Sequence, residues 1–175
     1  MLAHTGWGLE ILCLQGTIPD LPEILHIFPR PFDRLFKKWA DHYGLPLDLV
    51  CALTRQESAF QHRVASWAGA CGLMQVMPLT GMNLAAEIPL ANIDLLDPET
   101  NIRLGTRFLG WLHRTYRDPA DVLIGYNAGP GRISSWKRWF RMRHPEWDYW
   151  AFIETIPYAE TKGYIKVVLS NLMVY

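Results

Sequence analysis

The sequence has few cysteines and no excess of charge of either sign. Three cysteines among 175 residues, with no CxxC spacing, argue against a disulfide framework and against a zinc site. A single Cys51–Cys71 bridge stays open. Seventeen basic and 17 acidic residues cancel, which speaks against a protein dedicated to binding nucleic acid. The apolar stretch at residues 11–14 is much too short for a membrane span.

Several common catalytic patterns are missing as well. The sequence has no phosphate-binding loop, no Ser/His/Asp arrangement and no metal-ligand cluster. Its 6 histidines are dispersed, so surface or core positions suit them better than metal ligation. We therefore expect neither a metal nor another cofactor.

The first part of the chain differs from the rest. The first 29 residues contain no Lys or Arg, so the basic start of a secretory signal is absent. Residues 1–27 look like a lead-in, and one interpretation is the remnant of an upstream domain. Residues 28–175 are long enough, and with 50% hydrophobic residues in the chain apolar enough, to form one domain with a real core.

Turn and capping signals divide this domain into short helices, so we expect a mainly α fold. Asp97 and Asp118 each precede a proline, which is typical of a helix start, and Gly44 is typical of a helix end. Residues 63–77 lack a helical period and predict a loop with at most short strands. The expected helices cover residues 31–43, 47–60, 78–87, 98–116, 119 to about 128, and about 158 to the end.

Residues 130–152 are aromatic, basic and interrupted by Pro145. Two interpretations of the segment from Trp136 to Trp150 stay open. It forms a surface that contacts an anionic polymer or stacks sugar rings, or it forms aromatic core. We favour the core, because long basic side chains routinely cover apolar surface.

Glu57 is a carboxylate at an unexpected position. On a helix over residues 47–60 it falls on the apolar side, near the direction of Val50 and between those of Leu53 and Thr54. Burial would raise its pKa, as a general acid requires. The alternative is a partly solvated glutamate at a helix end, paired with Arg55 or Arg63.

Two further segments carry groups that suit a sugar ligand. In residues 69–78, two glycines permit close backbone approach, Gln75 offers an amide, and Met77 can pack on a sugar face. In residues 125–131, Tyr126 suits a hydrogen bond to an acid. Each segment also has an ordinary reading, as a turn before a helix and as a helix C-terminus with a core tyrosine.

Five ordered blocks together resemble the catalytic domain of the soluble lytic transglycosylases, the goose-lysozyme-like group. They are residues 55–60 (RQESAF), 69–78 (GACGLMQVMP), 96–106 (LDPETNIRLGT), 126–132 (YNAGPGR) and 152–165 (FIETIPYAETKGYI). The resemblance implies a lysozyme-like multi-helix domain over residues 28–175, with a groove for a glycan strand. It also implies non-hydrolytic cleavage of the β-1,4 bond between N-acetylmuramic acid and N-acetylglucosamine, leaving a 1,6-anhydro end. In this chemistry Glu57 acts first as acid and then as base.

The resemblance also assigns substrate-binding positions. It implies that Tyr126 hydrogen-bonds and orients Glu57, and that Glu160 meets the stem peptide of the substrate. The other reading of Glu160 is a first-turn acid that favours the helix dipole. The substrate-binding set by resemblance is Ser58, Ser66, Gln75, Met77, Tyr126, Asn127 and Glu160. The chain departs from the family pattern at Cys71, at Gly125, which we expect to loosen its helix, and at His62 and Arg63.

The remaining expectations follow from the family. The partner is peptidoglycan, both glycan strand and stem peptide, with a peripheral association with cell-wall machinery also open. We expect a monomer in the periplasm or cell envelope, despite the missing signal. Three other functions stay open: a hydrolytic muramidase, a non-catalytic glycan-binding module, and an interaction domain.

Overall fold

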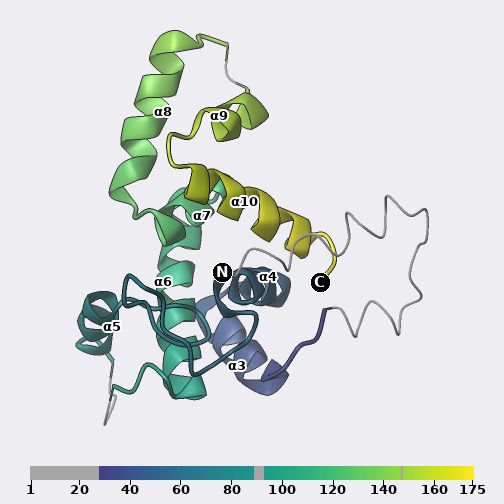
Figure 1. Cartoon of the computed structure of the whole chain (residues 1–175), viewed down its shortest axis with the longest axis vertical. Helices are drawn as coiled ribbons and strands as arrows, with labels where there is room; N and C mark the ends of the chain where they lie inside the picture. The colour runs from purple at the N-terminus through teal and green to yellow at the C-terminus, as the bar shows by residue number, and fades with distance from the viewer. Residues whose placement is uncertain (1–27, 89–92, 147) are drawn as a thin grey trace.

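A computed structural model describes residues 28–88, 93–146 and 148–175 of the chain (Figure 1). Over these residues the expected mainly α fold is confirmed, because they form eight helices and no extended strand. Residues 63–77 are a loop with two isolated bridges, Ala65 to Cys71 and Cys71 to Val76, as predicted. The helices are α3 (Asp33–Tyr43), α4 (Leu47–Ser58), α5 (Pro78–Ala85), α6 (Pro98–Tyr116), α7 (Pro119–Asn127), α8 (Gly131–Arg143), α9 (Tyr149–Thr155) and α10 (Ala159–Leu172).

The predicted helix starts are confirmed by their capping hydrogen bonds. The Asp97 carboxylate accepts from the backbone N–H of Thr100 at 2.8 Å, and the Asp118 carboxylate accepts from that of Ala120 at 3.0 Å. Gly44 ends α3 with φ of 68°. These features depend on neighbours in the sequence, which is why local patterns predict them.

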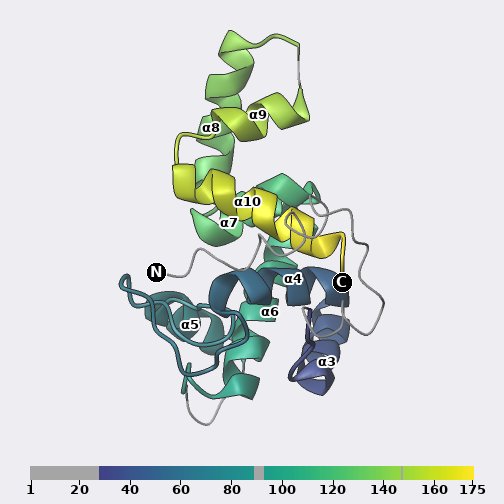
Figure 2. The same ribbon diagram turned by 45° about the vertical axis from the view of Figure 1, so that its right-hand side comes forward.

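The core forms around α4, whose residues 49–55 are all buried. Helices α3 and α10 pack against α4, and α6 packs against α3, α5 and α7. Figures 1 and 2 show α8 and α9 at one end of the molecule and α3 and α5 toward the other, with α10 crossing between them above α4. Residues 1–27, the predicted lead-in, lie outside the described residues.

Gly125 has a packing role that the sequence did not indicate. A Cβ atom at this position would lie 2.6 Å from Leu112 Cδ2 and 3.3 Å from Ile133 Cδ1. Helices α6, α7 and α8 therefore approach one another closely at Gly125. The cost of a glycine inside α7 is offset by this close packing.

The segment from Trp136 to Trp150 is core in one part and surface in another. Trp136 and Phe140 of α8 are buried, whereas Trp139 and Trp150 are exposed. Trp147 lies outside the described residues. The Arg143 guanidinium covers the ring of Trp139 at 4.4 Å, so the expected covering of aromatic surface by basic side chains is found at the outer face of α8.

The described residues contain neither a Cys51–Cys71 disulfide nor a membrane-spanning helix. Cys51 and Cys71 are both free thiols, so the bridge left open by the sequence does not form. Burial raises the pKa of the Cys51 thiol to about 12. No helix in this part of the chain has both the length and the apolar character to cross a bilayer.

Candidate active site

Glu57 stands one residue before the end of α4, where the helix stops earlier than predicted. Ala59 and Phe60 have left-handed backbone conformations, with φ of 49° and 63°, and so turn the chain away after Ser58. The turn leaves the Glu57 side chain at the helix terminus, facing the neighbouring helix α10. There Tyr164 donates a hydrogen bond from its hydroxyl to Glu57 Oε1 at 2.6 Å.

The surroundings of Glu57 favour its protonated form. Burial raises the pKa of this carboxyl from 4.5 to about 8, the hydrogen bond from Tyr164 lowers it, and the negative charge of Glu160 raises it. Desolvation is the largest of the three effects, because it penalises the ionised carboxylate. The sequence left open a pairing of Glu57 with Arg55 or Arg63, whereas the structure shows a hydrogen bond from Tyr164. The balance of these effects favours the protonated acid.

In the structure the hydrogen bond to Glu57 comes from Tyr164, whereas Tyr126 was the expected donor. The hydroxyl of Tyr126, at the end of α7, donates instead to the backbone carbonyl of Met74 at 2.9 Å. Tyr126 still lies near the carboxyl, and for this reason the charge of Glu57 helps to raise the pKa of Tyr126. The expectation that Tyr126 hydrogen-bonds Glu57 is therefore wrong, and its hydroxyl fixes the loop beside the carboxyl.

Ser58 holds this loop from the other side. Its side chain is only 3% exposed, and its hydroxyl donates to the backbone carbonyl of Leu73 at 2.7 Å. This hydroxyl is used within the protein, and the expected contact of Ser58 with substrate stays a prediction. Ser58 ties the end of α4 to the loop at residues 71–76.

Asn101 is a third support, and sequence reasoning assigned it no role. From the buried side of α6, its Oδ1 accepts from the backbone N–H of Met74 at 2.7 Å. Its Nδ2 donates to the backbone carbonyls of Cys71 and Leu95, both at 2.8 Å. The signal available in the sequence was an asparagine within the apolar period of a helix, where an unpaired amide would be costly.

The loop presents three of the predicted residues in different ways. Gln75 has a left-handed backbone, and its Nε2 donates to the carbonyls of Gly72 at 2.8 Å and Val64 at 3.3 Å. Its Nε2 therefore serves the loop, and the expected use of the Gln75 amide on a sugar stays a prediction. Ser66 accepts from the backbone N–H of Ala70 at 3.0 Å, and Met77 is exposed at the start of α5.

Asn127 and Glu160 lie where α7 ends and α10 begins. Asn127 Oδ1 accepts a hydrogen bond from the Thr161 hydroxyl at 2.7 Å, which joins the two helices. Glu160 is exposed in the first turn of α10, and its negative charge helps to raise the pKa of Glu57. Residues from α4, the 63–77 loop, α7 and α10 thus meet around the Glu57 carboxyl.

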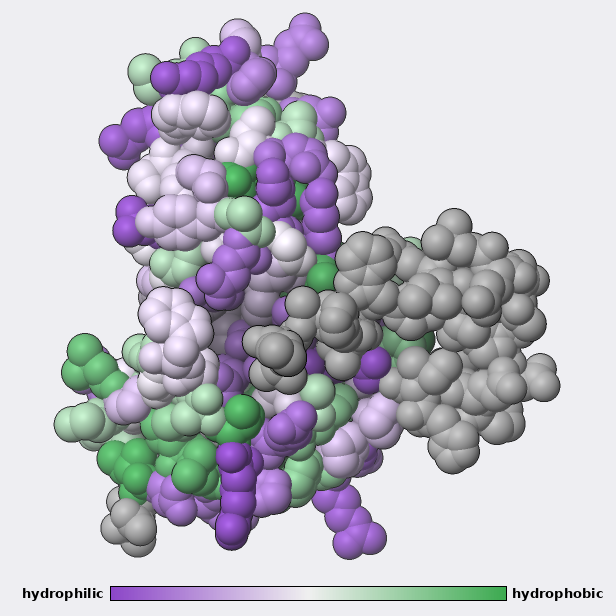
Figure 3. All heavy atoms as spheres, in the orientation of Figure 1, coloured by the Kyte–Doolittle hydropathy of each residue, from purple (hydrophilic) through white to green (hydrophobic). Residues whose placement is uncertain are grey.

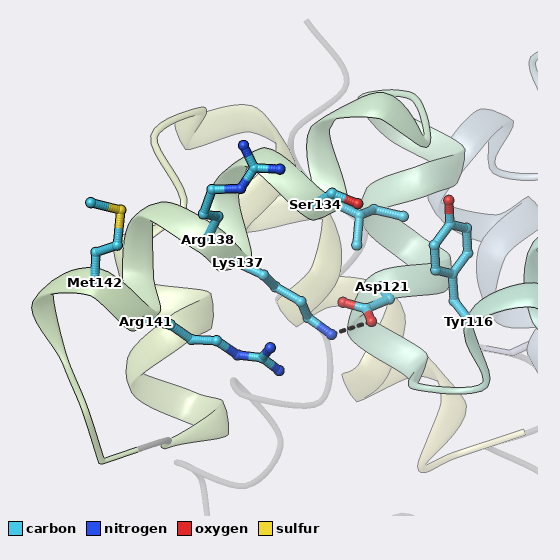
Figure 4. Close-up of a pocket in the computed structure, with 8 residues that line it drawn as sticks. Tyr116, Asp121, Ser134, Lys137, Arg138, Arg141 and Met142 are labelled. Atoms are coloured by element: carbon cyan, nitrogen blue, oxygen red, sulfur yellow. Dashed lines mark hydrogen bonds and ion pairs between the residues drawn. The ribbon is translucent and has the colours of Figure 1, made fainter.

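Two cavities lie outside this cluster. One, of about 580 Å³ between α7 and α8, contains an ion pair between Lys137 and the buried Asp121, and none of its lining residues is a predicted site residue (Figure 4). The other, of about 380 Å³, lies between α5 and α6. Figure 3 shows a gathering of hydrophobic residues over α5, where Leu79 and Met82 are exposed.

Among the described residues, no three His, Cys, Asp or Glu side chains lie close enough together to hold a metal ion.

Comparisons with known proteins give consistent results. Residues 34–146 match the family model described as "Transglycosylase SLT domain". The chain is 37% identical over 94% of its length to the soluble lytic murein transglycosylase of Escherichia coli K12, of which it covers 26%. The structure resembles the 70 kDa soluble lytic transglycosylase of E. coli, with a TM-score of 0.77, 36% identity, and coverage of 87% of this chain and 25% of that one.

A second solved structure is an inactive mutant of the lytic transglycosylase Slt from Pseudomonas aeruginosa, in which a glutamate is replaced by glutamine. Its TM-score is 0.76 and its identity 36%, covering 86% of this chain and 25% of that one. The chain spans about a quarter of the length of each of these relatives.

Proposed function

Because the chain belongs to the transglycosylase SLT domain family, we propose that it is a peptidoglycan lytic transglycosylase. It would cleave the β-1,4 bond between N-acetylmuramic acid and N-acetylglucosamine without water, leaving a 1,6-anhydro end. The observation that carries the proposal is the half-buried Glu57 carboxyl, whose pKa is raised to about 8 and whose Oε1 accepts a hydrogen bond from Tyr164.

The first half of the reaction uses the proton of Glu57. Tyr164 donates to Oε1, which leaves Oε2 as the natural place for the acidic proton. Glu57 passes this proton to the glycosidic oxygen as the bond from that oxygen to C1 of the muramyl residue breaks. A protonated carboxyl at neutral pH is the general acid that this step needs.

The second half returns the proton. The C6 hydroxyl of the muramyl residue attacks C1 and forms the new C6–O–C1 bond, while its proton goes to the Glu57 carboxylate. Because the nucleophile belongs to the substrate, it has an entropic advantage over free water. One tuned carboxyl then replaces the pair of carboxylates that most glycosidases use.

The surrounding residues support this chemistry in two ways. We propose that Ser58, Asn101 and Tyr126 fix the loop beside Glu57, since the hydroxyls of Ser58 and Tyr126 donate to carbonyls of that loop. The groove would be lined by the exposed Met77 and by the half-buried residues Ser66, Gln75 and Asn127. Glu160, exposed beside Glu57, suits the ammonium group of a stem peptide.

The proposed substrate places the protein in the periplasm or cell envelope. The name of the E. coli relative, a soluble lytic murein transglycosylase, supports peptidoglycan as the partner. A monomer suits a reaction whose residues all come from one chain. The domain boundary at residue 28 stays a prediction, and the family match begins just inside it, at residue 34.

A digest of purified peptidoglycan tests the proposal, with the products analysed by mass spectrometry. We expect muropeptides that end in a 1,6-anhydro sugar, each lighter by one water than the corresponding reducing-end product. Reducing-end products would mean that water reaches C1, and the protein would then be a muramidase. Binding of glycan strands without any release would make it a binding module.

A further inference from the structure

The cleft between α5 and α6 is connected to the candidate active site through the chain and through ring contacts. Helix α5 follows directly after Met77, and it contributes Thr80 and Asn83 to one wall of the cleft, with Glu87 from the turn after it. Helix α6 contributes Phe108 and Trp111 to the other wall. The volume of about 380 Å³ is in the lower part of the range of about 300–1,000 Å³ typical of small-ligand sites.

An aromatic path leads from this cleft to Glu57. The rings of Trp111 and Phe108 are stacked, with centroids 6.0 Å apart and planes 12° apart. The Phe108 ring in turn contacts Tyr126, with centroids 5.4 Å apart. Tyr126 lies close enough to Glu57 for the carboxylate charge to raise the pKa of its phenol. The cleft is therefore two ring contacts away from the neighbourhood of the reacting carboxyl.

The lining of the cleft suits a sugar. Trp111 is 43% exposed, so part of its ring is open to a ligand. Sugar rings place C–H groups on an aromatic face, whose negative charge density attracts them. Thr80 and Asn83 add a hydroxyl and an amide, which can bond sugar hydroxyl and N-acetyl groups. Arg107 and Glu87, both in the lining of the cleft, form an ion pair that joins its two sides.

We propose that this cleft is an outlying subsite that binds an N-acetylhexosamine residue of the glycan strand, stacked on Trp111. The bound residue belongs to the strand but is not one of the two whose bond is cleaved. The inference rests on the proposed function, because it takes the substrate to be a glycan strand. Contacts with Trp111 and Phe108 would then add binding energy only for glycan strands that are long enough to reach the cleft.

Binding of β-1,4-linked N-acetylglucosamine oligomers tests this assignment without any need for cleavage. For the wild type we expect affinity to increase from trimer to hexamer and longer oligomers. Trp111→Ala should weaken binding of the hexamer by about 3- to 10-fold, the effect of one lost stacking contact, and leave the trimer unchanged. Trp111→Phe keeps an aromatic face and should retain most of the affinity.

Trp139→Ala is the matched control, because Trp139 is 44% exposed and lies on α8, outside the cleft. We expect it to bind all oligomers as the wild type does. The assignment is wrong if Trp111→Ala binds the hexamer like the wild type, loses affinity equally for trimer and hexamer, or loses no more than Trp139→Ala. If the length effect appears but the wild type makes no 1,6-anhydro ends, the subsite stands and the proposed reaction fails.

Discussion

Tyr164→Phe removes the one hydroxyl that the structure places on the reacting carboxyl. The Tyr164 hydroxyl donates to Glu57 Oε1 at 2.6 Å, and this hydrogen bond lowers the pKa of Glu57. Its loss leaves burial and the charge of Glu160 unopposed, so the pKa of Glu57 rises above its value of about 8. A hydrogen bond to a charged group contributes about 1.5–3 kcal/mol, part of which the neutral acid keeps. We therefore expect an upward shift of about one pH unit.

The assay is the pH dependence of the release of 1,6-anhydro muropeptides. We expect the rate to fall at alkaline pH as Glu57 loses the proton that the proposed mechanism requires, so this limb should report the pKa of Glu57. In Tyr164→Phe the alkaline limb should move to higher pH. The maximal rate should also fall, because the carboxyl loses the contact that orients it.

Tyr126→Phe is the matched control. It also removes a tyrosine hydroxyl near Glu57, but one that donates to the backbone of Met74. We expect a lower rate from a looser loop, with no upward shift of the alkaline limb. A shift in Tyr126→Phe and none in Tyr164→Phe would show that the hydrogen-bond assignment is reversed.

Four other changes give further predictions. Glu160→Gln removes a charge that raises the pKa of Glu57, so the alkaline limb should move to lower pH, and added salt should shrink the difference between the two proteins. Asn101→Ala removes three hydrogen bonds of the loop and should lower the free energy of unfolding by about 3 kcal/mol in a urea titration. Asn127→Ala removes only the bond from Thr161 and should cost about 1 kcal/mol, and equal losses would contradict the assigned roles. Glu57→Gln should be more stable than the wild type, because a raised native pKa makes stability fall as pH rises from 4.5 to about 8. The gain should be near zero below pH 4.5 and on the order of a few kcal/mol above pH 8, and a gain that does not change with pH would refute this reasoning.

Local signals in the sequence were sufficient for most helix starts. Asp97 and Asp118 cap their helices through side chains that reach residues two or three positions away. The end of α4 was misplaced by two residues, because Ala59 and Phe60 adopt left-handed conformations that such residues rarely favour. Helix α8 was not expected, although its buried Ile133, Trp136 and Phe140 have helical spacing, because the surrounding aromatic and basic residues obscured the period.

The candidate site was predicted in position but not in its hydrogen bonds. Periodicity placed Glu57 on the apolar side of its helix, and the structure gives it the raised pKa that this placement implies. The donor to Glu57 lies 107 residues further along the chain, and no local pattern distinguishes Tyr164 from Tyr126. Asn101 acts across 27 residues for the same reason. Such contacts depend on how α6, α7 and α10 pack around α4.

The protonation state of Glu57 is the most direct test of the account. Carbon-13 NMR of protein labelled at the glutamate side-chain carboxyls follows each titration, and Glu57→Gln identifies the signal that belongs to Glu57. We predict a carboxyl signal that titrates with a midpoint near pH 8 and is absent from the variant. If the signal lost in Glu57→Gln instead titrates near the ordinary value of 4.5, Glu57 is ionised at neutral pH and cannot be the general acid.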